Sequence, residues 1–332
     1  YQQSRVSRLL LDDQGRVIGV EIKQLYSWTL SGLLHRLANK LANSTHMASP
    51  KLSSKCRGWI NQLEKRAVSR CIRANKGVIL SSGGFIFNRD MVRQHLPEFL
   101  PARMLGQAGD NGAGIALGVS AGGVMKEMHS ASAWRFINPP KTWPRGMVVN
   151  LAGQRYCDEA SYGAVIGTRM YRENLAQGML IIDSELYNNS TEFLSRDARS
   201  LISIVVKQQL KTAYQADTLE QLAELTGIDS GNLLATVELY NACARGEQQD
   251  PFNKSPSDMS VIAKPPFYAI DLAAGGSPAL SLGGLAVDEN SGQVKTLEGI
   301  GIEGLYAAGR TAVGIASNNY VSGLSIADGV FS

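Results

Sequence analysis

The sequence predicts an α/β protein in which a mixed α+β region interrupts the part that carries the main sheet. Three observations lead to this class. A short apolar run at residues 78–80 is followed by the turn Ser-Ser-Gly-Gly at residues 81–84. This pattern predicts a buried parallel strand with a ligand-binding turn at its carboxyl end. The glycine-rich residues 106–112 run into a helix of small residues. Two further strands, at residues 284–288 and 304–309, are bounded by glycine.

Length and composition place the chain among ordinary globular proteins. Its 332 residues allow two domains or one large one, and 44% apolar with 19% charged residues excludes disordered and fibrous classes. The four Cys have no CxxC or zinc spacing, and the four His lie apart from them, so we expect a reducing compartment and no metal site. No apolar run approaches the ~20 residues of a membrane span, so we expect a cytoplasmic protein.

The first elements are a hairpin and a basic helical segment. Strands at residues 5–11 and 16–22 flank a turn that ends in Gly15, which predicts a β-hairpin. Residues 25–41 then place five Leu at helical spacing behind Trp28. Trp59, Ile60, Leu63 and Val68 indicate a second, less regular helix.

Charge is concentrated in the same segment. Residues 23–76 hold 11 Lys or Arg and one acid, a net charge of +10, while the rest of the chain carries −6. A basic amphipathic helix with Trp can lie in a membrane interface, and the alternative is a surface insertion whose Leu stripe packs on the protein's own core. Both readings stay open. No nucleic-acid recognition motif accompanies the charge, so we expect no nucleic-acid partner.

The later elements follow from caps and breakers. Thr218, with Glu220 in the first turn, predicts the start of a helix, and residues 227–241 form a second helix after a turn. The glycine-rich loop before the helix near residue 113 has two interpretations: exposed amides for a phosphate or flavin oxygen, or close packing of a helix on a sheet. Residues 317–323 lead into a final helix.

Six segments together resemble one family of FAD flavoproteins, the fumarate reductase/3-ketosteroid dehydrogenase group. They occur in the family's order, at residues 78–85, 109–115, 153–159, 265–270, 282–285 and 304–310. The ending Asn318-Asn-Tyr-Val-Ser-Gly-Leu-Ser325 is most similar to the 3-ketosteroid Δ4-(5α)-dehydrogenases. The Δ1-dehydrogenases carry Tyr-Pro-Gly-Pro-Gly there, and fumarate reductases a His-Gly-Asn-Arg stretch.

The resemblance implies a partial Rossmann-like FAD-binding domain interrupted by a cap domain. The FAD part would be residues 1–86, including the basic insertion 23–76, together with residues 271–332, and the cap would be residues 87–270. The family's GxGxxG unit would lie before Tyr1, so we expect the chain to be a fragment of a longer protein.

The resemblance also implies the chemistry, an FAD-dependent oxidation of a steroid or another small apolar ketone. Two hydrogens leave adjacent carbons, one as a proton and one as hydride to flavin. Tyr320 would be the base, with Ser322 as its hydrogen-bonding partner and Tyr162 cooperating from the cap. Free tyrosine has a pKa of about 10, which is why the base needs a partner.

The cofactor contacts implied by the resemblance rest mainly on backbone geometry at turns and at a helix start. Arg310 stands where many relatives have Glu, and Arg155 and Glu159 are expected to form a structural ion pair. The residues expected to contact FAD are Ser82, Gly83, Gly84, Asp110, Gly283, Gly309, Arg310, Asn319, Leu324 and Ser325.

Two other functions stay open. One is a fumarate reductase-like enoate reductase of the same superfamily, which would use an Arg acid from among Arg169, Arg172, Arg196 and Arg199. The other is a truncated, flavin-free and inactive relative that acts only at a membrane surface through residues 23–76.

Overall fold

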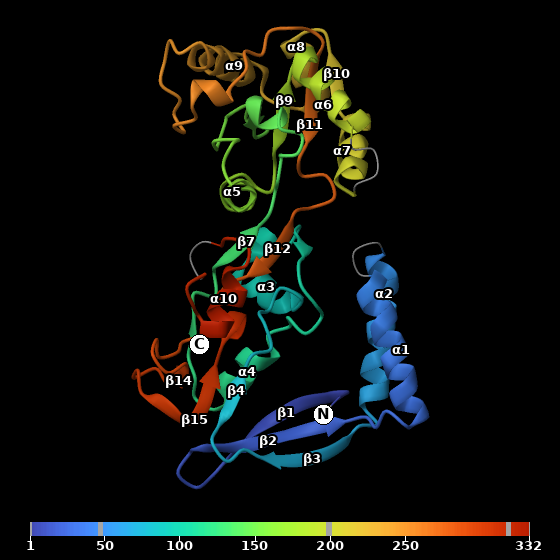
Figure 1. Ribbon diagram of the computed structural model, residues 1–332, viewed down its shortest axis with the longest axis vertical. Coiled ribbons are helices and arrows are strands. Elements are labelled where there is room, and N and C mark those ends of the chain that lie inside the picture. Colours follow the sequence, from blue (N-terminus) through green and yellow to red (C-terminus); the bar gives the residue numbers. More distant parts are fainter. Residues whose placement is uncertain (1, 46–48, 197–200, 317–319, 332) are drawn as a thin grey trace. The chain divides into compact units, whose positions relative to one another are not determined.

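The computed structural model describes residues 2–45, 49–196, 201–316 and 320–331, and these fold as two compact units, each built from separate stretches of chain (Figure 1). Unit 1 comprises Tyr1–His95, Leu105–Ser130 and Leu280–Ser332. Unit 2 comprises Leu96–Met104 and Ala131–Ala279. The chain therefore leaves unit 1 twice and returns to it twice, which brings segments far apart in sequence into one site.

The N-terminal sheet of unit 1 is antiparallel and has the order β1-β2-β3. The predicted hairpin is confirmed as β1 (Ser4–Leu11) and β2 (Val17–Gln24). The prediction that Val68 belongs to a helix is wrong, because it begins β3 (Val68–Arg73), where β-branched Val68 and Ile72 pair with β2. The helix that contains Trp59 ends earlier, at Glu64.

The second sheet of unit 1 positions the candidate site. Its order is β14-β15-β4, and β15 runs parallel to β4 and antiparallel to β14. The predicted strands at residues 78–80 and 304–309 are confirmed, whereas the one at residues 284–288 is confined to β13. The strands are β4 (Val78–Leu80), β14 (Gln293–Lys295) and β15 (Gly301–Ala307), with β13 (Gly284–Leu285) paired to β6 (Met125–Lys126).

The described residues of unit 1 form five α-helices. The predicted helix in the basic segment is present but begins at Leu30, because Thr29 accepts a hydrogen bond from the Gly32 amide and starts the first turn there. The predicted final helix is α10. The helices are α1 (Leu30–Thr45), α2 (Pro50–Glu64), α3 (Arg89–His95), α4 (Ala113–Ser120) and α10 (Leu324–Phe331).

Unit 2 is built on a sheet of order β10-β11-β9-β8, in which all neighbours are antiparallel. Its core is apolar and includes Met147, Ile181, Leu222 and Tyr240. A smaller sheet has the order β5-β12-β7. The strands are β5 (Arg103–Met104), β7 (Ala131–Ala133), β8 (Met147–Val149), β9 (Met179–Ile182), β10 (Tyr214–Ala216), β11 (Phe267–Asp271) and β12 (Pro278–Ser281).

Two helices of unit 2 begin at side-chain caps, and the helix predicted at residues 227–241 begins at Ser230. Thr218 accepts a hydrogen bond from the Gln221 amide at the start of α8, as expected, and Asp229 does the same for the Asn232 amide at α9. The helices are α5 (Gly163–Glu173), α6 (Ser184–Arg196), α7 (Leu201–Lys211), α8 (Leu219–Thr226) and α9 (Ser230–Ala244). Within the described residues of both units, no helix combines the length and hydropathy that crossing a membrane requires.

Candidate functional site

Two turns of unit 1 emerge side by side from the carboxyl ends of parallel strands. Leu80 at the end of β4 pairs with Ala307 at the end of β15, and the Ala308 amide donates to the Leu80 carbonyl at 3.1 Å. The turn at residues 81–84 and the 3₁₀ turn Gly309–Thr311 therefore start together. Ligands of open α/β sheets bind at such carboxyl ends, so this is where the geometry places a cofactor site.

Asp110 ties three loops together at this point. Its buried carboxylate accepts from the Gly84 amide at 3.2 Å, from the Gln107 amide at 3.0 Å and from Arg310 Nη2 at 3.0 Å. The Thr311 hydroxyl adds a bond of 3.1 Å to the Gly83 carbonyl. Sequence analysis placed Asp110 and Arg310 in the site without foreseeing that they pair, 200 positions apart in the chain.

Two glycines beside Asp110 leave no space for a side chain. Gly83 has φ +83°, and a Cβ there would lie 1.9 Å from Asp110 Oδ1. Gly106 has φ +125°, and its Cβ would lie 2.0 Å from Asp110 Oδ2. The left-handed conformation and the close approach both require glycine, so these turns are shaped for contact through their backbone.

Gly83→Ala is expected to lower the free energy of unfolding by more than the matched change Gly122→Ala. Both positions have positive φ and so share a conformational cost of about 1–2 kcal/mol, but a Cβ at Gly122 meets nothing within 4 Å. The clash at Gly83 should add about 1 kcal/mol or more, because it displaces a hydrogen-bonded buried carboxylate. Denaturant unfolding of the two variants measures the difference, and equal losses would show that Asp110 does not constrain the turn.

Arg310 fits the edge of a cofactor site. Its Nη2 bonds Asp110, while its Nη1 is buried without a hydrogen-bond partner among the described residues. Gly309, immediately before it, has φ +57° and open space where a Cβ would stand. A buried guanidinium nitrogen with spare donor capacity, next to an open glycine turn, suits the polar edge of a group such as FAD.

The glycine-rich loop before α4 serves packing, so its interpretation as an anion site is not supported. The Ala113 amide donates to Asn111 Oδ1 at 3.0 Å, and the Gly114 amide donates to Ser82 Oγ at 3.1 Å. A Cβ at Gly114 would meet Ser82, and one at Gly118 would meet Leu285 at 2.3 Å. The side chain of Ser82 thus holds α4.

Gly283 lies near these turns but is packed against other backbone. A Cβ there would lie 2.3 Å from the Glu127 carbonyl oxygen. A Cβ at its neighbour Gly284 would lie 2.5 Å from the Thr311 carbonyl oxygen. Gly283 therefore packs the residue before β13 against Glu127, and Gly284 packs β13 against Thr311 of the 3₁₀ turn.

Tyr320 is buried in unit 1, and its hydroxyl lies 3.1 Å from Ser325 Oγ on α10. From the sequence, Ser325 was expected only as a cofactor contact, and the expected pairing of Tyr320 with exposed Ser322 stays a prediction. The Leu324 amide donates to the Val321 carbonyl at 3.0 Å. Asn319 lies outside the described residues.

Asp328 is a site residue that sequence reasoning missed. It is buried on α10 and accepts from the Ile315 amide at 3.2 Å. A Cβ at Gly314 would collide with its carboxylate at 2.1 Å. Asp328 thereby anchors the loop after the 3₁₀ turn to α10, and no signal in the sequence distinguished it from a surface acid.

Tyr162 in unit 2 stands at the N-terminus of α5 and borders a pocket of about 430 Å³. Its ring meets that of Phe136 edge to face, with centroids 5.5 Å apart. The pocket is lined by apolar Phe136 and Ile137 and by polar Lys141, Arg145 and Asp258. The phenol of Tyr162 is partly exposed at this rim and is accessible to a ligand.

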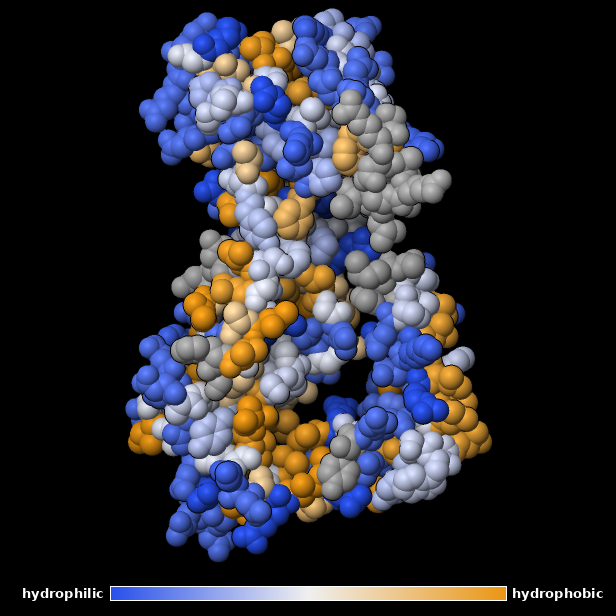
Figure 2. Space-filling view, in the orientation of Figure 1, coloured by the Kyte–Doolittle hydropathy of each residue, from blue (hydrophilic) through white to orange (hydrophobic). Residues whose placement is uncertain are grey.

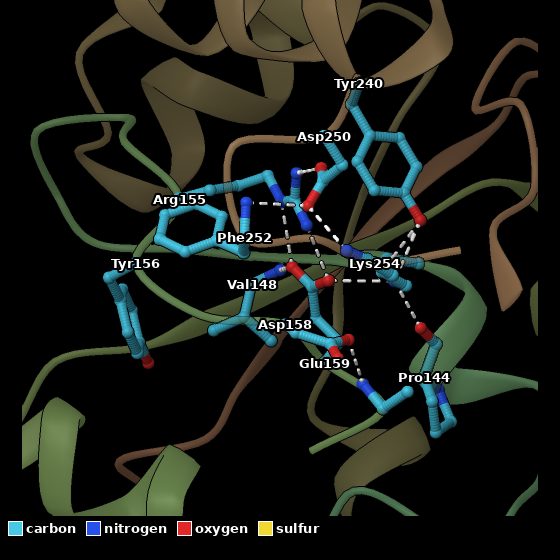
Figure 3. Close-up of polar contacts among 12 residues, drawn as sticks. Pro144, Val148, Arg155, Tyr156, Asp158, Glu159, Tyr240, Asp250, Phe252 and Lys254 are labelled. Atoms are coloured by element: carbon cyan, nitrogen blue, oxygen red, sulfur yellow. Dashed lines mark hydrogen bonds and ion pairs between the residues drawn. The ribbon is translucent and has the colours of Figure 1, made fainter. Parts of the chain in front are cut away.

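A buried charge network supports the floor of the same pocket (Figure 3). The predicted pair is confirmed: Arg155 Nη2 and Nε bond the two oxygens of Glu159 at 2.9 and 3.0 Å. Arg155 also pairs with Asp250. Lys254 Nζ, fully buried, donates to Glu159 at 2.8 Å and to Tyr240 at 3.1 Å.

Burial and pairing shift the pKa values in this network. Burial lowers the pKa of Lys254, and its pairing with Glu159 opposes that shift. For Arg155 burial acts in the same direction, but Glu159 and Asp250 together raise its pKa. Burial raises the pKa of Tyr240. The sequence did not single out Asp250 and Lys254, because loop composition does not reveal that two charged side chains turn inward.

Comparison with known proteins places the chain among flavoproteins. The family model described as FAD binding domain matches residues 1–326. The 3-oxo-5-alpha-steroid 4-dehydrogenase of Comamonas testosteroni is 32% identical over 324 residues, covering 92% of this chain and 59% of that protein. The NADH:acrylate oxidoreductase of Vibrio harveyi is 30% identical over 280 residues, covering 77% of this chain and 26% of that protein.

A solved structure shows the same relation. The 3-ketosteroid-delta4-(5alpha)-dehydrogenase from Rhodococcus jostii RHA1, in complex with 4-androstene-3,17-dione, superposes with a TM-score of 0.75 at 26% identity. The match covers 99% of this chain and 57% of that one. The chain thus spans little more than half the length of the steroid dehydrogenases it matches.

Proposed function

This chain belongs to the FAD binding domain family, and from that premise we propose that it carries the chemistry of an FAD-dependent 3-ketosteroid dehydrogenase. The observation that carries the proposal is the pair of buried Tyr320 and half-buried Ser325, whose hydroxyls lie 3.1 Å apart on the segment that packs over the Gly309 turn. Similarity to a steroid 4-dehydrogenase along 92% of the chain supports the same reaction.

The domain roles follow from the same premise. We propose that residues 1–86 and 271–332 form a partial Rossmann-like FAD-binding domain, and that residues 87–270 form a cap that interrupts it. The division into two compact units, each assembled from separate stretches, supports an interrupted domain. Residues 105–130 lie in unit 1, where Asp110 and α4 pack on the proposed FAD turns, so this part of the predicted cap would serve the cofactor.

The proposed FAD contacts fall into three groups, apart from Asn319. Gly83, Gly84 and Gly309 would approach the cofactor through backbone, with Arg310 donating to a polar group at its edge. Asp110, Ser82 and Gly283 would act one step removed, by holding these turns in place. Leu324 and Ser325 would present the first turn of α10, whose dipole favours negative charge. Asn319 stays a proposed contact from sequence alone.

The chain's own residues would move the proton. The carbon next to the ketone of a 3-ketosteroid is acidic, and its proton would pass to Tyr320 Oη, with the Ser325 hydroxyl able to relay it. Ser322 is exposed and lies two residues after Tyr320, and it would connect the Tyr320–Ser325 pair to solvent. Tyr162 would assist from the cap, where Phe136 fixes its ring. Bound FAD would supply the hydride acceptor.

Product analysis tests the proposed reaction. The FAD-loaded protein is incubated with a saturated 3-ketosteroid of the 5α series and an artificial electron acceptor, and NMR locates the new double bond. We expect it next to the ketone, between the carbons that a 4-dehydrogenase desaturates. A double bond on the other side of the ketone would assign the chain to the 1-dehydrogenases, and an unchanged steroid would contradict the proposal.

The similarity to an acrylate oxidoreductase favours one second candidate function, the reduction of an enoate. Of the four arginines considered as the acid, Arg169 has Nη1 engaged with the Tyr156 carbonyl at 3.1 Å, and Arg199 lies outside the described residues. Acrylate would reoxidise the reduced flavin of such an enzyme, whereas we expect no reoxidation by acrylate here.

A further inference from the structure

The helix pair α1 and α2 packs through small and polar residues and turns its large apolar residues outward. Ala42, Ser53 and Cys56 are buried between the helices with Ile60. The five Leu of the predicted stripe are all exposed: Leu30, Leu33, Leu34, Leu37 and Leu41. Within the described residues, the stripe therefore does not pack on a core of the chain, unlike the alternative expected from the sequence. A hairpin that had only to fold would bury these side chains, since each would gain about 2 kcal/mol on burial.

The exposed side chains form one continuous face. Leu34, Leu37 and Leu41 from α1 meet Trp59 and Leu63 from α2 across an apolar groove of about 520 Å³. Trp59 is 68% exposed, and Trp28, before α1, is 78% exposed. Figure 2 shows the apolar side chains gathered along the outer edge of this helix pair, beside hydrophilic ones. We call this surface the α1/α2 face.

Cations border the α1/α2 face on both helices. Helical periodicity places Arg36 and Lys40 beside the Leu stripe of α1. On α2 it places Lys51 and Lys55 beside Leu52 and Trp59. All four cations are exposed, and the apolar stems of such side chains can lie along an apolar surface. In each helix the order is the same: buried small residues, then the apolar stripe, then the cations. An apolar centre with a cationic border is the pattern of a helix that lies in a membrane interface.

The positive charge of this segment distinguishes between two partners that could cover the α1/α2 face, a second copy of the chain and an anionic membrane. A second copy of the chain would bring two segments of net charge +10 together, which is repulsive. An anionic partner is attracted instead, and exposed Trp among Lys and Arg suits the headgroup region of a bilayer. We propose that the α1/α2 face docks this protein on an anionic lipid bilayer, with the Leu and Trp side chains inserted and the cations at the headgroups.

This docking is independent of the proposed oxidation chemistry, so the two can fail separately. Deleting residues 23–76 is not a clean test, because it removes β3, which pairs with β2 in the N-terminal sheet. Point substitutions at exposed positions leave the sheet and the small buried core of the helix pair unchanged.

Vesicle flotation tests the proposal. Vesicles of phosphatidylcholine and phosphatidylglycerol in equal parts are compared with phosphatidylcholine alone. We expect the wild-type chain to float with the mixed vesicles and to remain below with the neutral ones, and high salt should weaken the binding. The double variant Leu37→Gln with Trp59→Ala should bind the mixed vesicles at least about tenfold more weakly.

Matched control variants distinguish docking through the α1/α2 face from nonspecific adsorption to vesicles. Leu297 is 82% exposed in the turn between β14 and β15, and Lys126 is exposed on β6. Lys51→Glu with Lys55→Glu should weaken binding by more than about tenfold, whereas Leu297→Gln and Lys126→Glu should not change it.

Three results would overturn the proposal. The first is a wild-type chain that does not float with either vesicle. The second is equal loss of binding in the control variants. The third is a change of oligomeric state, rather than of flotation, in the Leu37→Gln/Trp59→Ala variant, which would identify a second copy as the occupant. Circular dichroism confirms that each variant is folded before it is compared.

Discussion

Tyr320→Phe is expected to lower the rate of steroid dehydrogenation by about 10²–10⁴-fold and to leave flavin binding unchanged. The substitution removes one hydroxyl and keeps the buried ring, so packing around α10 should persist. The lost group is the one proposed to accept the proton, at 3.1 Å from Ser325 Oγ. Stopped-flow measurement of flavin reduction by steroid reports this step directly, because it is followed before any electron acceptor reacts.

Two further variants sharpen the test. Ser325→Ala keeps the Tyr320 hydroxyl but removes its partner, and we expect a smaller loss of rate than with Tyr320→Phe. Tyr214→Phe changes an exposed tyrosine of β10 and should leave the rate at the wild-type value. Flavin reduction at an unchanged rate in Tyr320→Phe would remove this residue from the mechanism.

Glu159→Gln is expected to destabilise unit 2 by about 3–5 kcal/mol. The four buried charges of the network sum to zero, and the substitution leaves Arg155 and Lys254 facing Asp250 alone. One positive charge then stays buried without compensation, while Lys254 Nζ loses an acceptor at 2.8 Å. Denaturant unfolding, followed by a signal from unit 2, measures the loss.

The matched control is Glu247→Gln, which removes an acid paired with an arginine at the surface. Glu247 bonds Arg245 at 2.7 Å in an exposed pair, and we expect no measurable change in stability. The double variant Glu159→Gln with Lys254→Met restores neutrality and should recover part of the loss. If Glu159→Gln is as harmless as Glu247→Gln, the network does not hold the pocket floor.

Much of the cofactor region could be predicted from sequence because it depends on glycines at strand ends. The apolar run before residues 81–84 and the Gly-Arg at residues 309–310 mark turns with glycine at positive φ, and both turns lie where the sheet predicts. The bond between Arg310 and Asp110 could not be foreseen, because it joins positions 200 residues apart whose meeting depends on the whole sheet.

Other failures have one common physical cause. Amphipathic spacing shows that a helix has an apolar face but not whether that face is covered, and the five Leu of α1 are exposed. In the same way, a charged residue in a loop or on a short helix suggests exposure. Lys254 and Asp250 in a loop and Asp328 on α10 are nevertheless buried with partners. Burial of a particular side chain is a property of tertiary packing, which a local pattern does not contain.

We propose that this chain holds FAD at the β4 and β15 turns and passes steroid hydride to it. The visible spectrum of the chain tests this after incubation with FAD, removal of free ligand and anaerobic addition of a saturated 5α-3-ketosteroid. We expect a retained flavin band that bleaches when the steroid is added. A chain that retains no flavin, or a retained band that the steroid leaves unchanged, would contradict the proposal.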